Sequence, residues 1–452
     1  MIYGILIGLI VIGVVFIAIS KNRLDFALKG IIIFLSVYTL LLSLLFKLTQ
    51  SVLLINILKS IKELIPALFI LIVFLASKIT MKLKLVKLDL YILLFGLLCV
   101  VYLSLPGSGS VKFFGFKSLT FFLLPYVLGR IINLKINQKL SILKLFVSIG
   151  LLASLLGLIE FIFYSSIHEL TGYSAYNQFF FNQNPSGHYG LTWTFETGSG
   201  HRRFSSFFAN PLEYASSILL IFPIAFGIFN YNKENNINSK IGRFAFLIIA
   251  VSIIFPFSRA SSIALMLEFF VIAIVFNKTR MLLNVVVISF TVFALLFISG
   301  KGVRSFVINT ITFENASSKG HLEEWGNGFS AILDTPLGHG LGTSGTIGAR
   351  FDNKTGGENQ FVINGVQLGI LGLLLYLLII WESIRKNLQL FRYGTGIDKW
   401  IGFVVVVTRI GIIIPTFTSA IETYLFLSFS LWLLTGISVK ASINNKKIAN
   451  IS

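Results

Sequence analysis

The sequence predicts an all-α protein, a polytopic bundle of membrane-spanning helices. Of its 452 residues, 55% are hydrophobic and only 12% are charged, with a mean hydropathy of +0.87. A soluble domain carries about 25% charged residues, so this composition belongs to an integral membrane protein. Apolar runs of roughly 20 residues, the length that crosses a bilayer, recur along the chain and are separated by short basic clusters.

The apolar runs predict about 12 to 13 spans. They lie near residues 2–20, 30–46, 64–80, 90–105, 118–134, 142–164, 210–230, 244–258, 261–277, 281–299, 363–382, 400–417 and 421–439. The first run lacks a preceding basic region and a small-residue cleavage site, so we expect a retained helix and not a signal peptide. Residues 48–62 have the pattern of an amphipathic helix at the membrane interface.

Two long polar loops divide the predicted spans. We expect N-terminal spans in 1–164, a first loop over 165–208, central spans in 209–299, a larger loop over 300–362, C-terminal spans in 363–439 and a tail over 440–452. Both loops exceed the usual connection length. They are rich in aromatic residues such as Tyr173 and Trp325, which a solvated linker would lack, so both should fold.

The basic clusters fall in alternate connections and hold more than half of the 37 lysines and arginines. By the positive-inside rule this predicts a multi-pass protein of the cytoplasmic membrane, with a cytoplasmic C-terminus and both long loops outside. The same distribution explains the net charge of +19 without a nucleic-acid partner. The single cysteine, Cys99, lies in an apolar run and excludes a disulfide framework within the chain.

Four arginines stand out by position. Arg202 and Arg203 end the first loop, Arg259 lies in a short turn, and Arg409 lies inside an apolar span. A charge in hydrocarbon is expensive, so such an arginine usually faces a cavity or a partner. Guanidinium groups bind phosphate oxygens through paired hydrogen bonds. We expect these sites to converge near the outer leaflet on a lipid diphosphate, although Arg202 and Arg203 could instead extend to lipid headgroups.

Among the carboxylates, Glu358 is the strongest candidate for chemistry. It lies in GGENQF, where the larger loop re-enters the membrane, and partial burial there would raise its pKa toward that of a general base. Glu160, Glu268 and Glu422 lie in or near spans and are expected to neutralise Arg409 or Arg259.

No metal site is predicted, because the five histidines show no zinc-binding spacing and no cysteine cluster exists. The run GHGLGTSG lacks the Lys-Ser/Thr ending of a phosphate loop. Its glycines are expected to permit tight turns.

Four segments, in this order, carry a resemblance: FANPLEYASSILLIFPIAF, FSRASSIALMLEF, WGNGFSAILDTPLGHGLGTSG and ENQFVINGVQLGILGLLLYLL. With the large loop between them, the chain resembles the O-antigen ligase / polysaccharide polymerase family (Wzy- and WaaL-like). The resemblance implies a glycosyltransferase without metal or cofactor, in which Arg203 (or Arg202) and Arg259 hold the diphosphate of a polyprenyl-linked glycan.

The chain departs from the ligase branch at two positions. Where the ligase branch has His-Asn at the re-entry motif, this chain has Glu358-Asn359. The Arg that often precedes the loop tryptophan is also missing, since His321 stands four residues before Trp325. Both departures favour the polymerase branch.

The implied reaction joins lipid-linked repeat units into a surface polysaccharide. Glu358, with His321 or Glu324 as further candidates, would take the proton of an acceptor hydroxyl, and the oxygen would attack the anomeric carbon with inversion. Arginines would stabilise the leaving diphosphate. The expected partners are a polyprenyl-diphosphate-linked oligosaccharide, membrane lipid, a chain-length regulator and a flippase.

The sugar is expected to meet Trp193, Trp325 and Asn359. The two tryptophans could equally pack the loops or anchor them at the interface. Two other functions remain open: a ligase that moves a finished glycan to a final acceptor, and a flippase or exporter of lipid-linked oligosaccharides. Transporters commonly show repeated halves, and the sequence has no such symmetry.

Overall fold

The prediction of an all-α membrane bundle is confirmed. The structure, a computed structural model, describes residues 24–76, 84–198, 200–235, 240–277, 280, 283, 287, 316–351 and 355–445. These residues form helices, with two isolated β-bridges and no strand. Within them, six helices are long and apolar enough to cross a membrane, or up to eight if each of two bent pairs is one span. The expected spans near 2–20 and 281–299 fall outside the described residues, apart from single positions of the second.

The first helices in the chain are α2 (Leu24–Ser36), α3 (Tyr38–Thr49), α4 (Val52–Ala76), α5 (Lys87–Ser104), α6 (Gly109–Thr120), α7 (Leu123–Ile131) and α8 (Ile136–Phe163). The middle of the chain forms α9 (Ile167–Leu170), α10 (Tyr173–Phe181), η1 (Trp193–Phe195), α11 (Pro211–Glu234), α12 (Lys240–Val251), η2 (Ser252–Ile254) and α13 (Arg259–Val275). The C-terminal part forms α16 (Ala316–Asp334), α17 (Gly345–Arg350), α18 (Gln360–Tyr393), α19 (Gly396–Gly411), α20 (Ile413–Thr418), η3 (Ile421–Thr423) and α21 (Leu425–Asn444).

Some predicted spans differ in shape from single straight helices. The span near 30–46 is the pair α2 and α3, bent by 66°, and the span near 118–134 is the pair α6 and α7, bent by 42°. The amphipathic segment 48–62 is not a separate interfacial helix, because it continues into the next apolar run as α4. Leu, Ile, Lys and Glu are all tolerated within a helix, and α4 also continues past Pro66.

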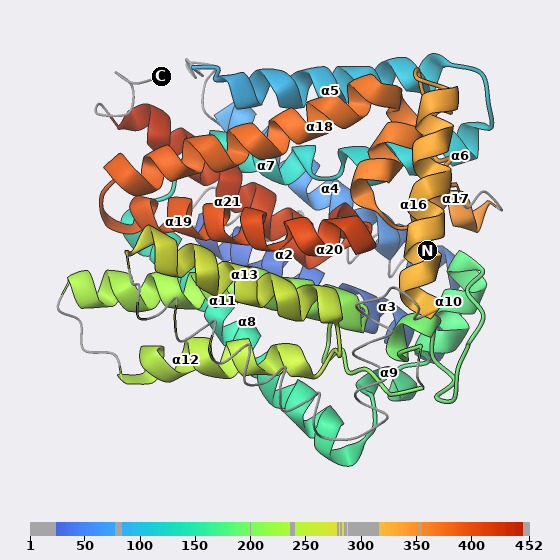
Figure 1. Ribbon diagram of the computed structural model, residues 1–452, viewed down its shortest axis with the longest axis horizontal. Helices are drawn as coiled ribbons and strands as arrows, with labels where there is room; N and C mark the ends of the chain where they lie inside the picture. Colours follow the sequence, from blue (N-terminus) through green and yellow to red (C-terminus); the bar gives the residue numbers. More distant parts are fainter. Residues whose placement is uncertain are drawn as a thin grey trace.

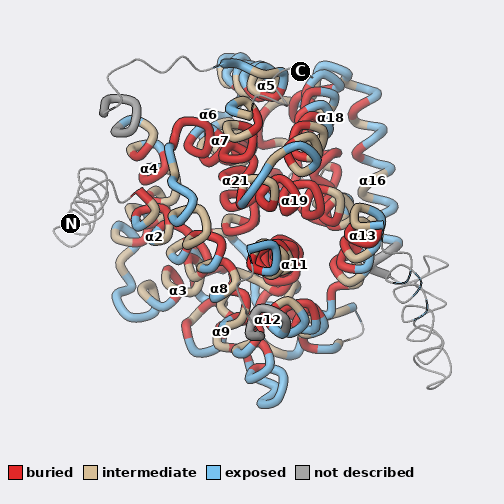
Figure 2. Tube along the Cα trace, turned by 90° about the vertical axis from the view of Figure 1, so that its left-hand side faces the viewer, coloured by how far each residue is buried: buried red, intermediate tan, exposed pale blue. Residues whose placement is uncertain are grey.

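The centre of the bundle is formed by α11, α19 and α21, which are mostly buried, while α5 lies at the rim (Figures 1 and 2). Small residues bring helices close together there. A Cβ atom on Gly129 of α7 would lie 2.4 Å from the carbonyl oxygen of Leu433 and 3.0 Å from Gly436 of α21. Close backbone approach at small residues is a common way to pack helices in membranes.

The two ends of the bundle differ in chemistry. At one end lie α9, α10, α16 and α17 (Figure 1). At the other, the segment 132–139 meets 395–398 and the end of α21 around a basic cavity of about 600 Å³ that includes Lys135, Lys139 and Lys440. The Nζ of Lys440 donates to the carbonyls of Ile131 and Ile132, both at 2.9 Å. We call the first the loop end and the second the basic end.

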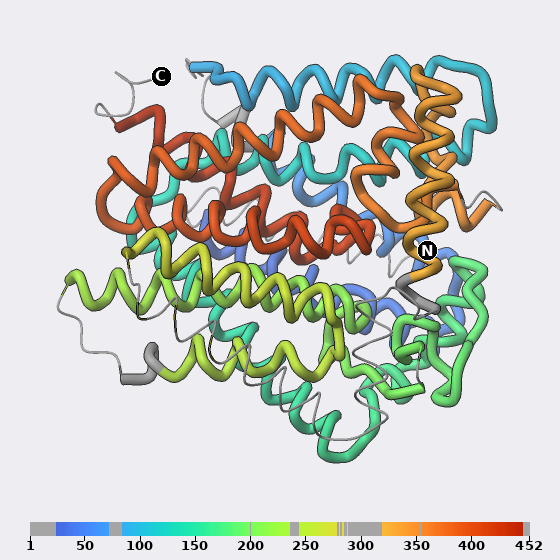
Figure 3. Tube along the Cα trace, viewed as in Figure 1, coloured from blue at the N-terminus to red at the C-terminus, as the bar shows by residue number. Residues whose placement is uncertain are grey.

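The larger loop is itself folded. Its described residues 316–351 and 355–359, here called the cap, contain α16 and α17 and lie across the start of α18 (Figure 3). Gly338, Gly340 and Gly342 have φ angles of 87°, 97° and 78°, which confirms the expected turn-forming role of GHGLGTSG. The turn docks against a break in α18 at Gly369 (φ 69°), where His339 N donates to Val366 O at 2.7 Å and Ile370 N donates to Pro336 O at 2.9 Å.

Candidate functional site

Glu358 lies at the junction of the cap and α18. The next residue, Asn359, caps α18: its Oδ1 accepts from Phe361 N at 2.9 Å and Val362 N at 3.3 Å. The cap helix α16 lies against this junction, since a Cβ on Gly357 would meet the carboxylate of Glu324. Burial, and secondly the charge of Glu324, raise the pKa of Glu358 to about 7. A carboxyl group with this pKa can accept a proton near neutral pH.

Arg203 and Arg259 lie close together at the same end. Phe204 N donates to Phe255 O at 3.1 Å, which fastens the end of the first loop to the turn before α13. Ser258 caps α13 through Ser261 N at 3.3 Å, so Arg259 is the first residue of the helix. A positive charge there opposes the helix dipole, so it does not stabilise the helix. Burial, and secondly the charge of Arg259, lower the pKa of Arg203 to about 10.

The cap brings His321 to this arginine pair. Burial, and secondly the charge of Arg259, lower the pKa of His321. Its Nδ1 is 3.9 Å from an oxygen of Glu324, one turn further along α16. One face of α16 therefore connects the arginine pair with the Glu358 junction. Arg203, Arg259, His321, Glu324 and Glu358 form what we call the outer cluster.

A cavity of about 160 Å³ opens beside the outer cluster. Its lining includes Glu358, Tyr424, Glu213 and the half-exposed Trp193. Burial and the neighbouring Glu358 raise the pKa of Tyr424, while the positive charge of Arg203 opposes this shift. Tyr424 thus lies near both the Glu358 carboxylate and Arg203, and it remains protonated at neutral pH.

Sequence reasoning missed Glu213 and Tyr424. Glu213 lies in the first turn of α11, after the N-cap Asn210, where a carboxylate complements the helix dipole. Its Oε1 accepts from Phe426 N at 3.1 Å and joins α11 to α21. The Asn-Pro start of α11 could have marked Glu213 as a first-turn residue. No local signal marks Tyr424, which reaches the cavity through the packing of η3 and α21.

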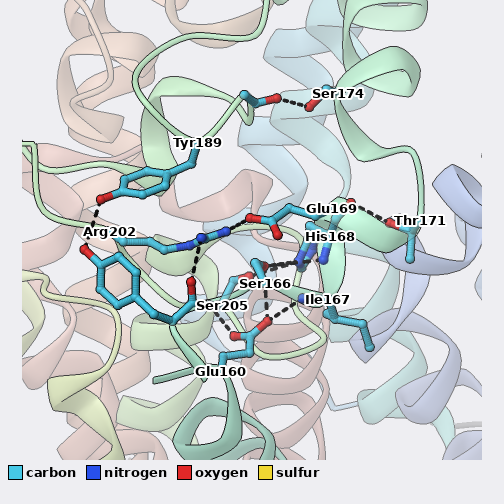
Figure 4. A network of polar contacts seen from close by, with 12 residues as sticks. Glu160, Ser166, Ile167, His168, Glu169, Thr171, Ser174, Tyr189, Arg202 and Ser205 are labelled. Atoms are coloured by element: carbon cyan, nitrogen blue, oxygen red, sulfur yellow. Dashed lines mark hydrogen bonds and ion pairs between the residues drawn. The ribbon is translucent and has the colours of Figure 1, made fainter. Parts of the chain in front are cut away.

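Arg202 points toward Glu169 (Figure 4). It forms an ion pair with Glu169, donates from Nη1 to Tyr164 O at 2.8 Å, and lies 4.6 Å from the ring centre of Tyr189. Arg202 therefore fastens the first loop to the end of α8, and neither a headgroup nor a substrate is needed to explain its burial.

Glu160, which was expected to neutralise Arg409 or Arg259, instead binds the backbone of the first loop (Figure 4). It accepts from the backbone N–H groups of Ile167, Ser205 and Ser206 at 2.9, 3.2 and 2.8 Å. Burial lowers the pKa of the adjacent His168 to about 3, so this histidine is neutral and takes part in hydrogen bonds with Ser205. These contacts order both ends of the first loop.

Arg409 belongs to a separate buried network. It lies 3.9 Å from the carboxylate of Glu422 and 3.8 Å from the ring centre of Trp432. Glu422 also accepts from Tyr376, Ser428 and Trp432, so the expected neutralisation of Arg409 by Glu422 is present. Glu268 is fully buried against Gly411 of α19.

The remaining predicted residues occupy different settings. Trp325 lies between His321 and Phe417, with ring centres 6.3 and 6.0 Å away. The Oδ1 of Asn359 is used as a helix cap, and its buried Nδ2 has no hydrogen bond among the described residues. Trp193 lines the cavity with 51% of its surface exposed, so it is the most accessible of these candidates for a sugar.

Replacing Arg202 by Gln is expected to loosen the first loop. The ion pair with Glu169 is half exposed, with 35% of the Glu169 side chain accessible, so the loss should be about 2 kcal/mol, below that of a fully buried pair. Limited proteolysis of the purified protein should show faster cleavage within 182–198. An unchanged cleavage rate combined with lost activity would instead assign Arg202 to substrate binding.

No protein-family model matches the chain, and no curated protein matches it. Among the residues that the structure describes, no group of three or more His, Cys, Asp or Glu side chains is arranged to hold a metal ion.

Proposed function

We propose that the protein is a polymerase that joins polyprenyl-diphosphate-linked oligosaccharide repeat units by inverting glycosyl transfer. The observation that carries the proposal is the outer cluster: two neighbouring arginines lie near a carboxyl group whose pKa is raised to about 7, beneath a folded cap. The resemblance of the segments from about 200 to 380 supports the substrate class. The cluster lies at the loop end, opposite the basic end, which agrees with a site on the extracytoplasmic side.

Each member of the outer cluster has a role in this proposal. Arg203 and Arg259 bind the donor diphosphate and stabilise the charge that grows on it as the bond to the anomeric carbon breaks. Glu358 accepts the proton of the acceptor hydroxyl as its oxygen bonds to that carbon. Glu324 keeps the pKa of Glu358 high, and His321 contributes to the polar wall beside Arg259. The donor's own diphosphate supplies the driving force.

Deletion of the gene tests the proposal against the other functions. We expect surface glycans to be reduced to single repeat units that are still displayed outside, with the carrier lipid flipped normally. Long chains that accumulate on the carrier lipid would indicate a ligase. Single repeats confined to the inner leaflet would indicate a flippase. The native gene on a plasmid should restore the long glycan ladder, as seen by gel electrophoresis of surface material.

A further inference from the structure

A second group of cations lies at the loop end, outside the outer cluster. Lys59 and Lys62 lie on α4, Lys117 on α6 and Arg350 at the end of α17. One carboxylate, that of Glu63, pairs with Lys62 at 3.4 Å and with Lys117 at 3.1 Å. We call these four basic residues the lysine cluster. Among the described residues it keeps a surplus of positive charge after these ion pairs.

Aromatic rings hold the lysine cluster in place. Lys59 Nζ is 4.5 Å from the ring centre of Phe180 and 4.6 Å from that of Phe181. The Arg350 guanidinium lies 5.7 Å from Phe181 and 4.7 Å from Phe114. Lys59 and Arg350 thus share the Phe181 ring, which brings α4, α10 and α17 together. Rings can offset part of the repulsion between cations, but they leave the net charge unchanged.

The like charges act on one another. Lys59 lies before the apolar part of α4, and burial together with the charges of Arg350, Lys62 and Lys117 lowers its pKa to about 8. Lys62 is within electrostatic reach of Glu213, which lines the cavity beside Glu358. Thr346 of α17, one turn before Arg350, also lines that cavity, so the lysine cluster lies next to it. A bound anion would relieve the repulsion among the four cations.

An apolar groove reaches the lysine cluster at Lys117. It has a volume of about 890 Å³ and runs between α4, α5, α6 and α7. Two ion pairs line it, Glu63 with Lys117 and Asp89 with Arg130. Leu93, Gly96, Leu97 and Val100 of α5 are part of its apolar wall. From Asp89 to Val100 the helix rises roughly 16 Å, which is long enough to hold several carbons of a hydrocarbon tail.

We propose that the lysine cluster and this groove bind a second lipid with a phosphate-containing head, whose hydrocarbon tail lies between α4, α5 and α7. Lys117 lines the groove and belongs to the lysine cluster, whose other cations lie beside it. An apolar groove next to surplus positive charge complements an anionic amphiphile. If the proposed function holds, this lipid is the acceptor repeat unit on its own polyprenyl diphosphate. The donor head then lies at Arg203 and Arg259, and the cavity beside Glu358 lies between the two heads.

The proposal can be tested by photocrosslinking the full-length protein in phosphatidylcholine nanodiscs. The probe is a polyprenyl diphosphate with a photoreactive group in its tail, and crosslinked peptides are identified by mass spectrometry. We expect labelling of residues 89–100 and 123–131. Lys59→Gln and Arg350→Gln should each weaken it about fivefold, and Gly96→Leu should abolish it by filling the groove.

Two variants serve as matched controls. Lys112→Gln removes a charge on α6 that is bonded to the carbonyls of Leu103 and Leu105, and Ser148→Leu adds an apolar side chain on the exposed face of α8. Both should retain full labelling. The proposal is overturned if the charge variants label normally, if inorganic pyrophosphate competes as well as the lipid, or if the uncharged polyprenol binds equally. It also fails if the wild type shows no labelling in the groove, as when apolar residues of the chain itself fill it.

The outcome is separable from that of the proposed function. If the groove is labelled but deletion of the gene leaves the long glycan ladder intact, the lipid site stands and the polymerase is removed. If the deletion reduces the ladder to single repeat units but the groove is not labelled, the polymerase stands and the lipid site is removed.

Discussion

Replacing Glu358 by Gln is expected to lower the rate of glycosyl transfer by about 10²- to 10⁴-fold, the usual contribution of a general base. Glutamine preserves the shape of the side chain but cannot accept the proton. The rate should be measured with purified protein and lipid-linked repeat units, and the glycan ladder of cells carrying the variant should collapse to short chains. Glu323→Gln changes an exposed carboxylate on α16 and should leave the rate unchanged.

The pH dependence gives a second measure of the same prediction. A base acts in its deprotonated form, so a pKa near 7 means that the wild-type rate falls about tenfold for each pH unit below 7 and levels off above it. Glu324→Gln removes the neighbouring negative charge, so the pKa of Glu358 should fall and the rate should begin to drop at a lower pH. If the Glu358→Gln protein keeps the full rate and the same fall in rate below pH 7, another residue is the base.

Replacing Arg203 or Arg259 by Gln is expected to lower the rate by about 10²- to 10³-fold, the effect of removing a group that stabilises charge in the transition state. Lysine at either position keeps the charge but not the paired hydrogen bonds, so Arg→Lys should restore only part of the rate. Binding of the donor should weaken less than the rate falls, because the diphosphate gains charge as it leaves.

The double variant tests whether the two arginines act on one group. Its loss should be smaller than the product of the two single losses, because each guanidinium works on the same diphosphate. Arg392→Gln, an exposed change at the basic end, is the control. Independent, fully multiplicative losses would contradict a shared ligand.

The membrane fold could be predicted from the sequence because the signal is local. Apolar runs of about 20 residues must satisfy their own backbone hydrogen bonds, and helices do so within one segment. Shape was harder. The bend between α2 and α3 and the continuity of α4 depend on what each helix packs against. The residues at the ends of α3, Val37 and Thr49, carry no sequence signal for either feature.

The site was only partly predictable for the same reason. Position at a loop end was enough to select Arg203, Arg259 and Glu358. It did not separate Arg203 from Arg202, which are adjacent in sequence but point to different partners. Tyr424 could not have been selected at all, because its place beside Glu358 results from the packing of chain segments more than 60 residues apart.

The break in α18 at Gly369 holds the cap in place. The turn at 336–340 is joined to this break by backbone hydrogen bonds to Val366, Gln367 and Ile370. Moving the whole cap outward would break these bonds and leave the buried backbone groups of Val366 and Gln367 without partners, which costs free energy. The cap is therefore expected to stay closed, and in the proposed reaction the lipid-linked substrates would enter laterally from the bilayer, between helices.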